Sequence, residues 1–236
     1  MITTVVFDLD DTLYSEVDYC NSGFRATARF LSRTQAPGLD QEEIFSALWA
    51  QFQQGNRTQT FNAALDTLGI PHDEQLIRSL IMAYRKHMPR IKLPQESRRV
   101  LDELAQTYTL ALLTDGFLPA QRLKVQALKI KKYFRHIVFT EQLGRLFWKP
   151  SPVGFQRLCE ILSVPGRQMV YIGDNPAKDF IAPNSLGFTT LQIHRPDRIH
   201  DTVAPNDQAR AHHVLDSLDE IPRQLEALSP VTPTGA

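Results

Sequence analysis

Three short apolar runs in this sequence each end abruptly at a polar cluster. The pairs of run and cluster are Val5–Phe7 with Asp8, Thr109–Leu113 with Thr114, and Met169–Ile172 with Gly173 and Asp174. Such runs are typical of strands that are buried on both faces of a parallel sheet. Ligands of α/β proteins bind beyond the carboxyl ends of those strands. The pattern therefore predicts a parallel sheet with polar site residues along one edge.

Segments with helical periodicity separate further strands in the second part of the chain. Helices are expected at 98–104, 119–128, 155–162, 180–186 and 218–228, and additional strands at 136–139, 189–193 and 212–215. Alternation of strand and helix gives a mostly parallel sheet that is covered on both faces. The predicted fold class is therefore α/β, with a Rossmann-like doubly wound parallel sheet.

The stretch between the first two strands has a different character. Phe24, Ala28 and Leu31 recur at helical spacing, and the same spacing continues through this stretch without a strand pattern. Four consecutive helices are expected here, with turns at Pro37–Gly38 and at 69–71. We interpret them as a helical unit that is inserted into the α/β domain. The predicted boundaries are 1–14 and 93–228 for the α/β core domain, 15–92 for the helical insert and 229–236 for a disordered tail.

The charges of the chain are balanced, with 26 Lys plus Arg against 26 Asp plus Glu. This balance argues against a nucleic acid polymer or an anionic membrane as a partner. No apolar run is long enough to span a membrane, and the N-terminus lacks the basic region of a signal peptide. The two cysteines, Cys20 and Cys159, lie far apart, which fits a reducing compartment. We therefore expect a cytoplasmic protein, either a monomer or a homodimer.

The first polar cluster places two carboxylates close together. Asp8 and Asp10 are two residues apart, so their side chains point to the same side of an extended backbone. Neighbouring carboxylates repel each other, and a hard divalent cation with oxygen ligands relieves that repulsion. The cluster therefore predicts a site for a divalent metal ion.

Four polar clusters are expected just beyond strand ends, and they follow one another in a fixed order along the chain. They are Asp8-Leu9-Asp10-Asp11-Thr12, Thr114-Asp115-Gly116, Lys149-Pro150 within WKPSP, and GDNPAKDF at 173–180. Each is common alone, but the ordered set resembles the four motifs of the haloacid dehalogenase (HAD) superfamily, and the resemblance covers nearly the whole chain. It implies a phosphatase whose type-one (C1) helical cap is inserted between the first and second motifs.

The resemblance also implies a role for each acidic residue of the site. Asp8 would attack phosphorus to give an aspartyl-phosphate, and it would also bind Mg²⁺. Asp10 would act as general acid and then as general base, while its backbone carbonyl would bind the metal ion. Asp174 would complete the metal site. The implied cofactor is therefore Mg²⁺.

The second and third motifs would hold the phosphoryl group. Thr114 would offer its hydroxyl, backbone N–H groups near Gly116 would approach closely, and Lys149 would neutralise negative charge. Asp115 belongs to the same phosphate-binding loop, although Asp at such a place is also a common turn residue. The supporting residues would be Asn175, next to the metal site, and Asp179, which would hold Lys149 in place.

The expected cap offers the candidates for substrate specificity. Tyr14 and Tyr19 flank the junction between the expected domains, and both could line the cleft. Arg57 lies in a polar stretch, 53–58, that interrupts the apolar periodicity. It could bind a second phosphate or a carboxylate of the substrate. The alternative is an ordinary loop between two helices.

Together these features predict a magnesium-dependent phosphatase that hydrolyses a small phosphorylated metabolite. A nucleotide, a sugar phosphate or a phosphoglycolate-like acid would be compatible, and the wording FDLDDTLY resembles nucleotidase-like members of the superfamily. A phosphomutase or phosphotransferase of the same fold remains an alternative, because a cap that excludes water favours transfer. A 2-haloacid dehalogenase is a further alternative, but those enzymes lack the second Asp of the DxD pair, which is present here as Asp10.

Overall fold

The computed structural model describes residues 1–34 and 38–228 of the chain. The chain divides into two compact units. The first contains Met1–Glu16, Lys92–Gly116 and the described residues from Leu128 onward, and the second contains Val17–Ile91 and Phe117–Ala127. The Pro37 part of the expected turn and the expected tail at 229–236 lie outside the described residues.

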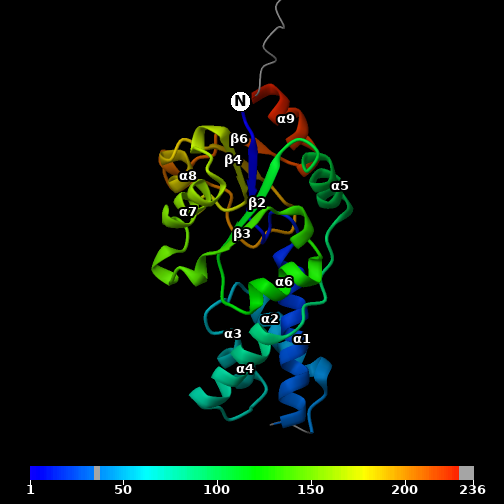
Figure 1. The fold of residues 1–236 in the computed structure, drawn as a ribbon. Helices are drawn as coiled ribbons and strands as arrows, with labels where there is room; N and C mark the ends of the chain where they lie inside the picture. The colour runs from blue at the N-terminus through cyan, green and yellow to red at the C-terminus, as the bar shows by residue number, and fades with distance from the viewer. Residues whose placement is uncertain (35–37, 229–236) are drawn as a thin grey trace, which may run out of the picture. The chain divides into compact units, whose positions relative to one another are not determined.

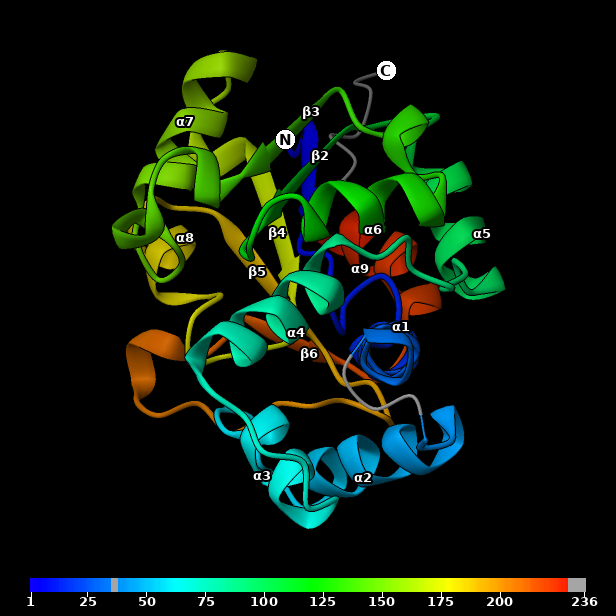
Figure 2. The ribbon, with the colours of Figure 1, turned by 90° about the horizontal axis from the view of Figure 1, so that it is seen from below.

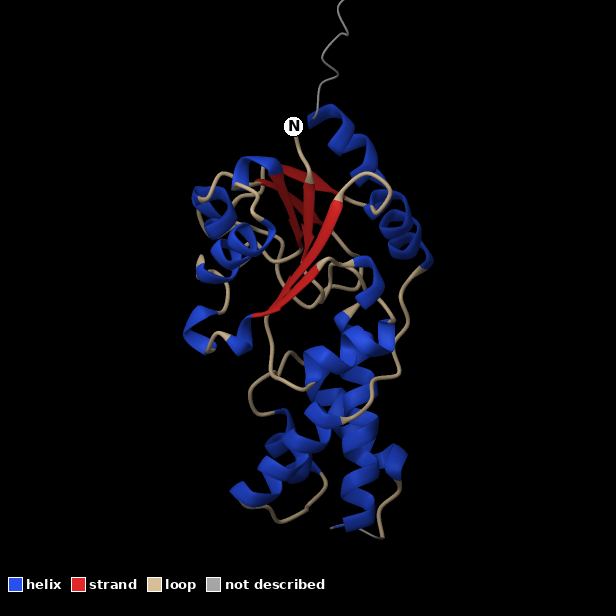
Figure 3. Cartoon of the chain, viewed as in Figure 1, coloured by secondary structure: helices blue, strands red, loops and turns tan. Residues whose placement is uncertain are grey.

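The first unit is built on a parallel sheet of six strands, drawn in red in Figure 3. The strand order is β3-β2-β1-β4-β5-β6, so the first strand of the chain lies in the middle. Chain order reverses at β1, which is the place where α/β proteins bind ligands. The strands are β1 (Thr4–Phe7), β2 (Thr109–Thr114), β3 (His136–Phe139), β4 (Met169–Gly173), β5 (Thr189–Ile193) and β6 (His213–Leu215).

The central strands are buried on both faces, as their apolar composition predicts. All four residues of β1 and all five of β4 are buried. The register pairs Val6 with Ala111 on one side and with Tyr171 on the other. Both neighbours of β1 run parallel to it, so the three carboxyl ends lie at the same edge of the sheet.

Helices cover both faces of this sheet. On one face α7 (Val153–Leu162) and α8 (Ile181–Ser185) pack over a buried cluster that includes Val6, Leu113 and Phe155. On the opposite face lie α5 (Gln95–Leu104) and α9 (Ile221–Leu228), which contact each other (Figure 1). This arrangement confirms the predicted α/β fold with a doubly wound parallel sheet.

Most predicted elements occur within two or three residues of their expected bounds. The strand at 136–139 and the strand at 189–193 have the predicted limits. One expectation is wrong. Lys149 does not follow directly on a strand, because β3 ends at Phe139 and two short 3-10 turns, Thr140–Gln142 and Arg145–Phe147, come before it.

The second unit is helical, as predicted. Its helices are α1 (Glu16–Thr34), α2 (Gln41–Gln53), α3 (Thr60–Thr67) and α4 (Glu74–Lys86), and α2 and α3 lie side by side (Figure 2). Phe24 of α1 is at the centre of its aromatic core, where it contacts Phe52, Phe61 and Tyr84 with ring centroids 5.3–6.2 Å apart. Gly23 leaves room for this cluster, since a Cβ there would lie 2.4 Å from the ring of Tyr84.

One segment groups differently from the expected domain boundaries. Most of α6 (Ala120–Leu128) belongs to the helical unit, although the sequence analysis assigned it to the core. Two cation–π contacts join this segment to other residues of that unit. The guanidinium of Arg85 lies 3.4 Å from the ring centre of Phe117, and the ammonium of Lys124 lies 4.0 Å from that of Tyr19. None of the helices in the described residues is long and apolar enough to cross a membrane.

The position of Phe155 gives a test of the packing of the first unit. Its side chain is fully buried, with its ring centre 4.9 Å from that of Tyr171. Phe155→Ala should lower the free energy of unfolding by roughly 3–5 kcal/mol, because it removes buried area and leaves a cavity. Ile161→Ala on the same helix is the control, since Ile161 is 37% exposed, and its effect should be about 0.5 kcal/mol or less. Urea unfolding of both variants would measure the change in the free energy of unfolding. Equal losses of stability in the two variants would contradict the assignment of Phe155 to the buried core.

Candidate active site

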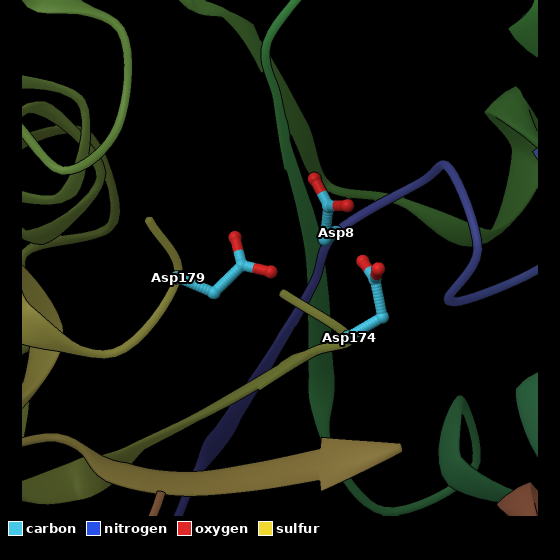
Figure 4. A group of neighbouring side chains, drawn as sticks. All are labelled: Asp8, Asp174 and Asp179. Atoms are coloured by element: carbon cyan, nitrogen blue, oxygen red, sulfur yellow. The ribbon is translucent and has the colours of Figure 1, made fainter. Parts of the chain in front are cut away.

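Three carboxylates meet at the carboxyl edge of the sheet (Figure 4). They belong to Asp8, Asp174 and Asp179, and one oxygen from each lies within 4.8 Å of the others. Asp8 follows β1 directly and Asp174 follows β4. The backbone N–H of Asp8 donates to the carbonyl of Ile172, which holds the two strand ends side by side. Parallel pairing thus brings together Asp8 and Asp174, which are 166 positions apart in the chain.

A buried ammonium group joins two of these carboxylates. Lys149 Nζ lies 2.6 Å from Asp8 Oδ1 and 2.7 Å from Asp179 Oδ1. Its side chain is 1% exposed, so both ion pairs lie out of contact with water. Asp179 also accepts a hydrogen bond from the backbone N–H of Asn175 (2.9 Å) through its other oxygen. Both oxygens of Asp179 are therefore occupied, which suits it to hold Lys149.

Tyr171 completes this group, and the sequence analysis missed it. Its hydroxyl accepts from Lys149 Nζ (3.0 Å) and donates to Asp179 Oδ1 (3.1 Å). Burial raises the pKa of Tyr171 well above its usual value, so the phenol keeps its proton. A tyrosine within a buried apolar strand is the signal that could have revealed it, because a buried hydroxyl needs a hydrogen-bond partner.

Burial and mutual repulsion control the charges of this group. Burial raises the pKa of Asp8 to about 6, although the positive charge of Lys149 acts in the opposite direction. Burial, together with the charges of Asp179 and Asp8, raises the pKa of Asp174 well above 3.8. Burial disfavours the charge of Asp179 too, but Lys149 and Lys178 outweigh it and its pKa is lowered. The same carboxylates raise the pKa of Lys149 despite its burial.

Lys178 is a second cation that the sequence analysis did not assign. It precedes Asp179, it is half-buried, and the charges of Asp8, Asp179 and Asp174 raise its pKa against the effect of burial. Lys178 lies within the GDNPAKDF motif, next to an acidic site residue, and this neighbour is the sequence feature that could have indicated its place at the site.

Asp115 ties the second cluster of the sequence to the third. Its carboxylate accepts the backbone N–H of Lys149, at 3.1 Å from Oδ2, and the hydroxyl of Thr140, at 2.6 Å from Oδ1. The side chain expected in the phosphate-binding loop therefore serves to fix the start of the lysine segment. The Thr114 side chain is buried next to it, and Gly116 has a φ of +133°, which favours glycine.

The first loop holds the remaining residues of the DxDxT cluster. The carboxylate of Asp10, which is half-buried, accepts a hydrogen bond from the hydroxyl of Tyr14. Thr12 Oγ1 donates to Asp174 Oδ1 at 3.5 Å. Asp11 adopts a left-handed backbone with φ +51°, and its carboxylate accepts the N–H groups of Glu16 and Ile199. Tyr14 therefore contacts a proposed catalytic residue, and Asp11 is a turn residue.

Two of the predicted specificity residues lie in the helical unit and have partners there. The hydroxyl of Tyr19 donates to the backbone carbonyl of Tyr84 at 3.5 Å. The guanidinium of Arg57 lies 3.9 Å from the ring centre of Phe52 and donates to its carbonyl oxygen. The contacts of Arg57 are those of a loop that closes on its own helix, and its role in specificity stays a prediction.

The donor set fits a divalent cation with oxygen ligands. Asp174 Oδ2 is buried and has no hydrogen-bond partner within residues 1–34 and 38–228. A buried carboxylate oxygen without a partner is costly, so this atom calls for a cation. Asp8 has one oxygen on Lys149, and Asp179 has both oxygens occupied. Asp8 and Asp174 are therefore the carboxylates that would hold Mg²⁺, whose preferred ligands are oxygens.

Comparison with known proteins assigns the family. The sequence pattern of the haloacid dehalogenase-like hydrolases matches residues 2–187 of this chain. The chain belongs to this family of hydrolases. The matched range includes all four polar clusters, from Asp8 to Asp179.

Relatives of this HAD hydrolase cover almost its whole length. It is 26% identical to the glyceraldehyde 3-phosphate phosphatase of Methanopyrus kandleri, over 94% of this chain and 99% of that protein. It is also 26% identical to the ribulose-1,5-bisphosphate 5-phosphatase of Halopiger xanaduensis, over 94% of this chain and 98% of that one. The crystal structure of 2-haloacid dehalogenase from Pseudomonas syringae matches with a TM-score of 0.65 and 23% identity, over 96% of this chain and 99% of that chain. This last likeness concerns the fold alone.

The unpartnered oxygen of Asp174 leads to a prediction about metal binding. Millimolar Mg²⁺ should raise the melting temperature of the parent protein, by the equivalent of about 2.7 kcal/mol at a hundredfold excess over the dissociation constant. Asp174→Asn should shrink this gain, because a charged ligand is lost. Without Mg²⁺ the same variant should melt above the parent at pH 7, because the raised pKa of Asp174 means that its ionised form destabilises the folded state.

Thermal melting at several pH values would check both parts of this prediction. The gain from Mg²⁺ should decline as the pH falls through about 6, since protons then compete for Asp8, whose pKa lies there. Asp216→Asn is the control, because its side chain is 92% exposed, and it should behave as the parent. A melting temperature that ignores Mg²⁺ at pH 7.5 would contradict the metal assignment.

Proposed function

We propose that this protein hydrolyses a small phosphomonoester with the help of Mg²⁺, through a phosphorylated Asp8. The observation that carries the proposal is the buried ion pair between Asp8 and Lys149, at 2.6 Å, next to the unpartnered oxygen of Asp174. The family is one of hydrolases, and both sequence relatives are named as phosphatases. The enzyme is accordingly a hydrolase of phosphoric monoesters.

The reaction takes place in two displacements. An oxygen of Asp8 forms a bond to phosphorus while the bond from phosphorus to the ester oxygen breaks, and the electron pair leaves with that oxygen. Water then attacks the phosphorus of the aspartyl-phosphate, which restores the Asp8 carboxylate and releases inorganic phosphate. Splitting hydrolysis in this way is covalent catalysis. The pKa of Asp8 near 6 leaves most of this carboxylate ionised at neutral pH, as a nucleophile must be.

Asp10 carries the protons of both steps. It gives a proton to the leaving ester oxygen in the first step and takes one from the attacking water in the second. The hydrogen bond from the hydroxyl of Tyr14 restricts the orientation of the Asp10 carboxyl. Tyr14 thus contributes through Asp10, without any need for a contact with substrate.

Positive charge at the site neutralises the phosphoryl group. Lys149 stabilises Asp8 in the resting site, and it faces the negative charge that passes to the phosphoryl oxygens in the reaction. When bound by Asp8 and Asp174, Mg²⁺ supplies further charge neutralisation for those oxygens. Thr114 offers its hydroxyl, and the Asp115–Gly116 backbone offers N–H groups. Asp179 and Asn175 keep Lys149 and the loop of Asp174 in place.

A phosphorylated sugar is the substrate class that we favour. Both sequence relatives are named for phosphate esters of sugars, a triose and a pentulose. A nucleotide or a phosphoglycolate-like acid is the competing class. A screen of phosphorylated metabolites, scored by released phosphate, would separate the two, and the same screen with alcohols added would reveal phosphotransfer in place of hydrolysis.

A dehalogenase reaction is the weaker candidate. The match to a dehalogenase structure concerns the fold. A carbon–halogen bond needs no general acid for its leaving group, yet Asp10 is present and hydrogen-bonded in the first loop. We place the reaction in the cytoplasm, in a monomer or homodimer, where the thiols of Cys20 and Cys159 stay reduced.

Replacement of the nucleophile gives the most direct test of the proposed function. Asp8→Asn should abolish phosphate release from p-nitrophenyl phosphate, because the amide cannot form the aspartyl-phosphate. The near-isosteric change should leave the fold intact, which circular dichroism would verify. The exposed Asp216→Asn variant should keep the activity of the parent. A rate for Asp8→Asn within threefold of the parent would show that Asp8 is not the nucleophile.

The general acid can be tested through the leaving group. Asp10→Asn should slow hydrolysis of an alkyl phosphate by roughly 10²–10⁴-fold, because alkoxide is a poor leaving group without a proton. The loss should be smaller with p-nitrophenyl phosphate, whose phenolate leaves without help. Rates on both esters, measured at saturating Mg²⁺, would give the comparison. Equal losses on the two substrates would exclude Asp10 as the acid.

A further inference from the structure

The segment that follows β5 reaches back to the catalytic loop. Arg195 lies two residues beyond the end of β5, and its side chain is 13% exposed. Its Nε donates to the backbone carbonyl of Thr12 at 2.8 Å. One of its Nη atoms donates to the hydroxyl of Ser97 at 3.1 Å, and the other lies 3.8 Å from Glu96. The sequence analysis had given this arginine no role.

Ser97 makes a similar contact to the next residue of the loop. Its side chain is fully buried, and its hydroxyl donates to the backbone carbonyl of Leu13 at 2.6 Å. Arg195 and Ser97 therefore hold two successive carbonyls of the loop between Asp8 and Leu13, and they are hydrogen-bonded to each other. A planar guanidinium with several fixed donors suits such a double contact, whereas an ammonium does not.

A third contact fixes the same loop from the same segment. The backbone N–H of Ile199 donates to Asp11 Oδ2 at 2.8 Å, and Glu16 donates to Oδ1 at 2.7 Å. Asp11 is in the left-handed region, with φ +51°, where a residue other than glycine needs support from its surroundings. The segment 195–199 thus contacts the loop at Asp11 and at Thr12.

The loop that Arg195 and Ser97 hold also contacts the proposed metal ligand Asp174. Thr12, whose carbonyl accepts from Arg195, donates its hydroxyl to Asp174 Oδ1 at 3.5 Å. Asp8 and Asp10 lie on the same short loop, four and two residues before Thr12. A displacement of this loop would move the nucleophile and the general acid together.

We propose that Arg195 is a positioning residue that, with Ser97, holds the loop Asp8–Leu13 in the geometry required for turnover. The inference deepens the proposed function and rests on it. The guanidinium touches no reacting atom and acts through the carbonyl of Thr12. Glu96, which balances its charge, has further partners in Ser217 and Leu218 and does not depend on the arginine.

The first experiment compares the kinetics of Arg195→Ala and the parent with p-nitrophenyl phosphate. We expect kcat to fall roughly 10- to 100-fold, since a displacement of about 1 Å at reacting groups can cost 10²-fold. KM should change little, because the arginine does not contact substrate. Guanidinium ions at millimolar levels should restore much of the lost kcat, and the same ionic strength of sodium chloride should not.

Three further variants act as controls. Arg210→Ala removes an arginine that pairs with Asp207 and is 72% exposed, and it should keep the kcat of the parent. Ser97→Ala should lower kcat, and its effect should not add to that of Arg195→Ala, because the two residues act on one loop. Arg195→Lys keeps the charge near Glu96 and so protects the fold. It should still lose kcat, because an ammonium cannot reproduce both contacts of the guanidinium.

Amide hydrogen exchange separates this inference from the proposed function. In Arg195→Ala the peptide that covers residues 8–16 should exchange faster than in the parent, while that of β2 should not change. If loop exchange is faster but the parent releases no phosphate from any ester, the proposed function fails and the structural role of Arg195 stands. An unchanged kcat, an unchanged loop exchange, or a lost kcat that guanidinium leaves in place would each overturn the positioning role.

Discussion

The rest of the site depends on one buried ammonium group. Lys149 lies between Asp8 and Asp179, with Tyr171 as its third partner, and all four side chains are buried. Each charge would cost several kcal/mol to bury alone, and only close pairing with complete hydrogen bonding offsets that cost. Because Tyr171 lies in β4 and the other three residues lie in loops, one of them directly after β1, the group forms only when the sheet is correctly assembled. The site therefore depends on the folded structure of the first unit.

The sheet places two of the site carboxylates at one edge, and hydrogen bonds between loops fix the positions of the other site residues. Parallel pairing of β1 with β4 places Asp8 and Asp174 at one edge, but Lys149 lies ten residues beyond the end of β3. The carboxylate of Asp115 accepts a hydrogen bond from the backbone N–H of Lys149 and so fixes the position of this distant residue. Arg195 and Ser97 donate hydrogen bonds to backbone carbonyls of the loop that carries Asp8 and Asp10, and so hold that loop. The ion pair between Asp8 and Lys149 therefore joins two loops that are each held by hydrogen bonds.

The strand ends could be predicted from sequence because burial on both faces requires continuous apolar runs, such as Val5–Phe7 and Met169–Ile172. The clusters that follow these runs contain Asp8 and Asp174, which the structure brings together. Local patterns could not reveal contacts that only the folded chain makes. In the sequence Tyr171 is indistinguishable from the apolar residues of its strand, and only the folded structure shows its hydroxyl bound to Lys149. Arg195 likewise resembles a surface residue, and only the structure shows its hydrogen bond to the carbonyl of Thr12. For the same reason the sequence could not group 117–127 with the helical unit, since the cation–π contacts of Phe117 and Lys124 join residues that are distant in the chain.

The charge of the site sets an order for its ligands. The carboxylates of Asp8, Asp174 and Asp179 face the ammonium groups of Lys149 and Lys178, which leaves one negative charge in excess when all are ionised. Burial raises the pKa of both Asp8 and Asp174, and for Asp174 the negative charges of Asp179 and Asp8 add to that effect. A phosphate dianion that approached such a group would be repelled. A divalent cation would reverse the sign of the excess, so that the same group of side chains would then attract the dianion. If the proposed function holds, metal binding before substrate binding is therefore the order that the electrostatics of these five side chains favours.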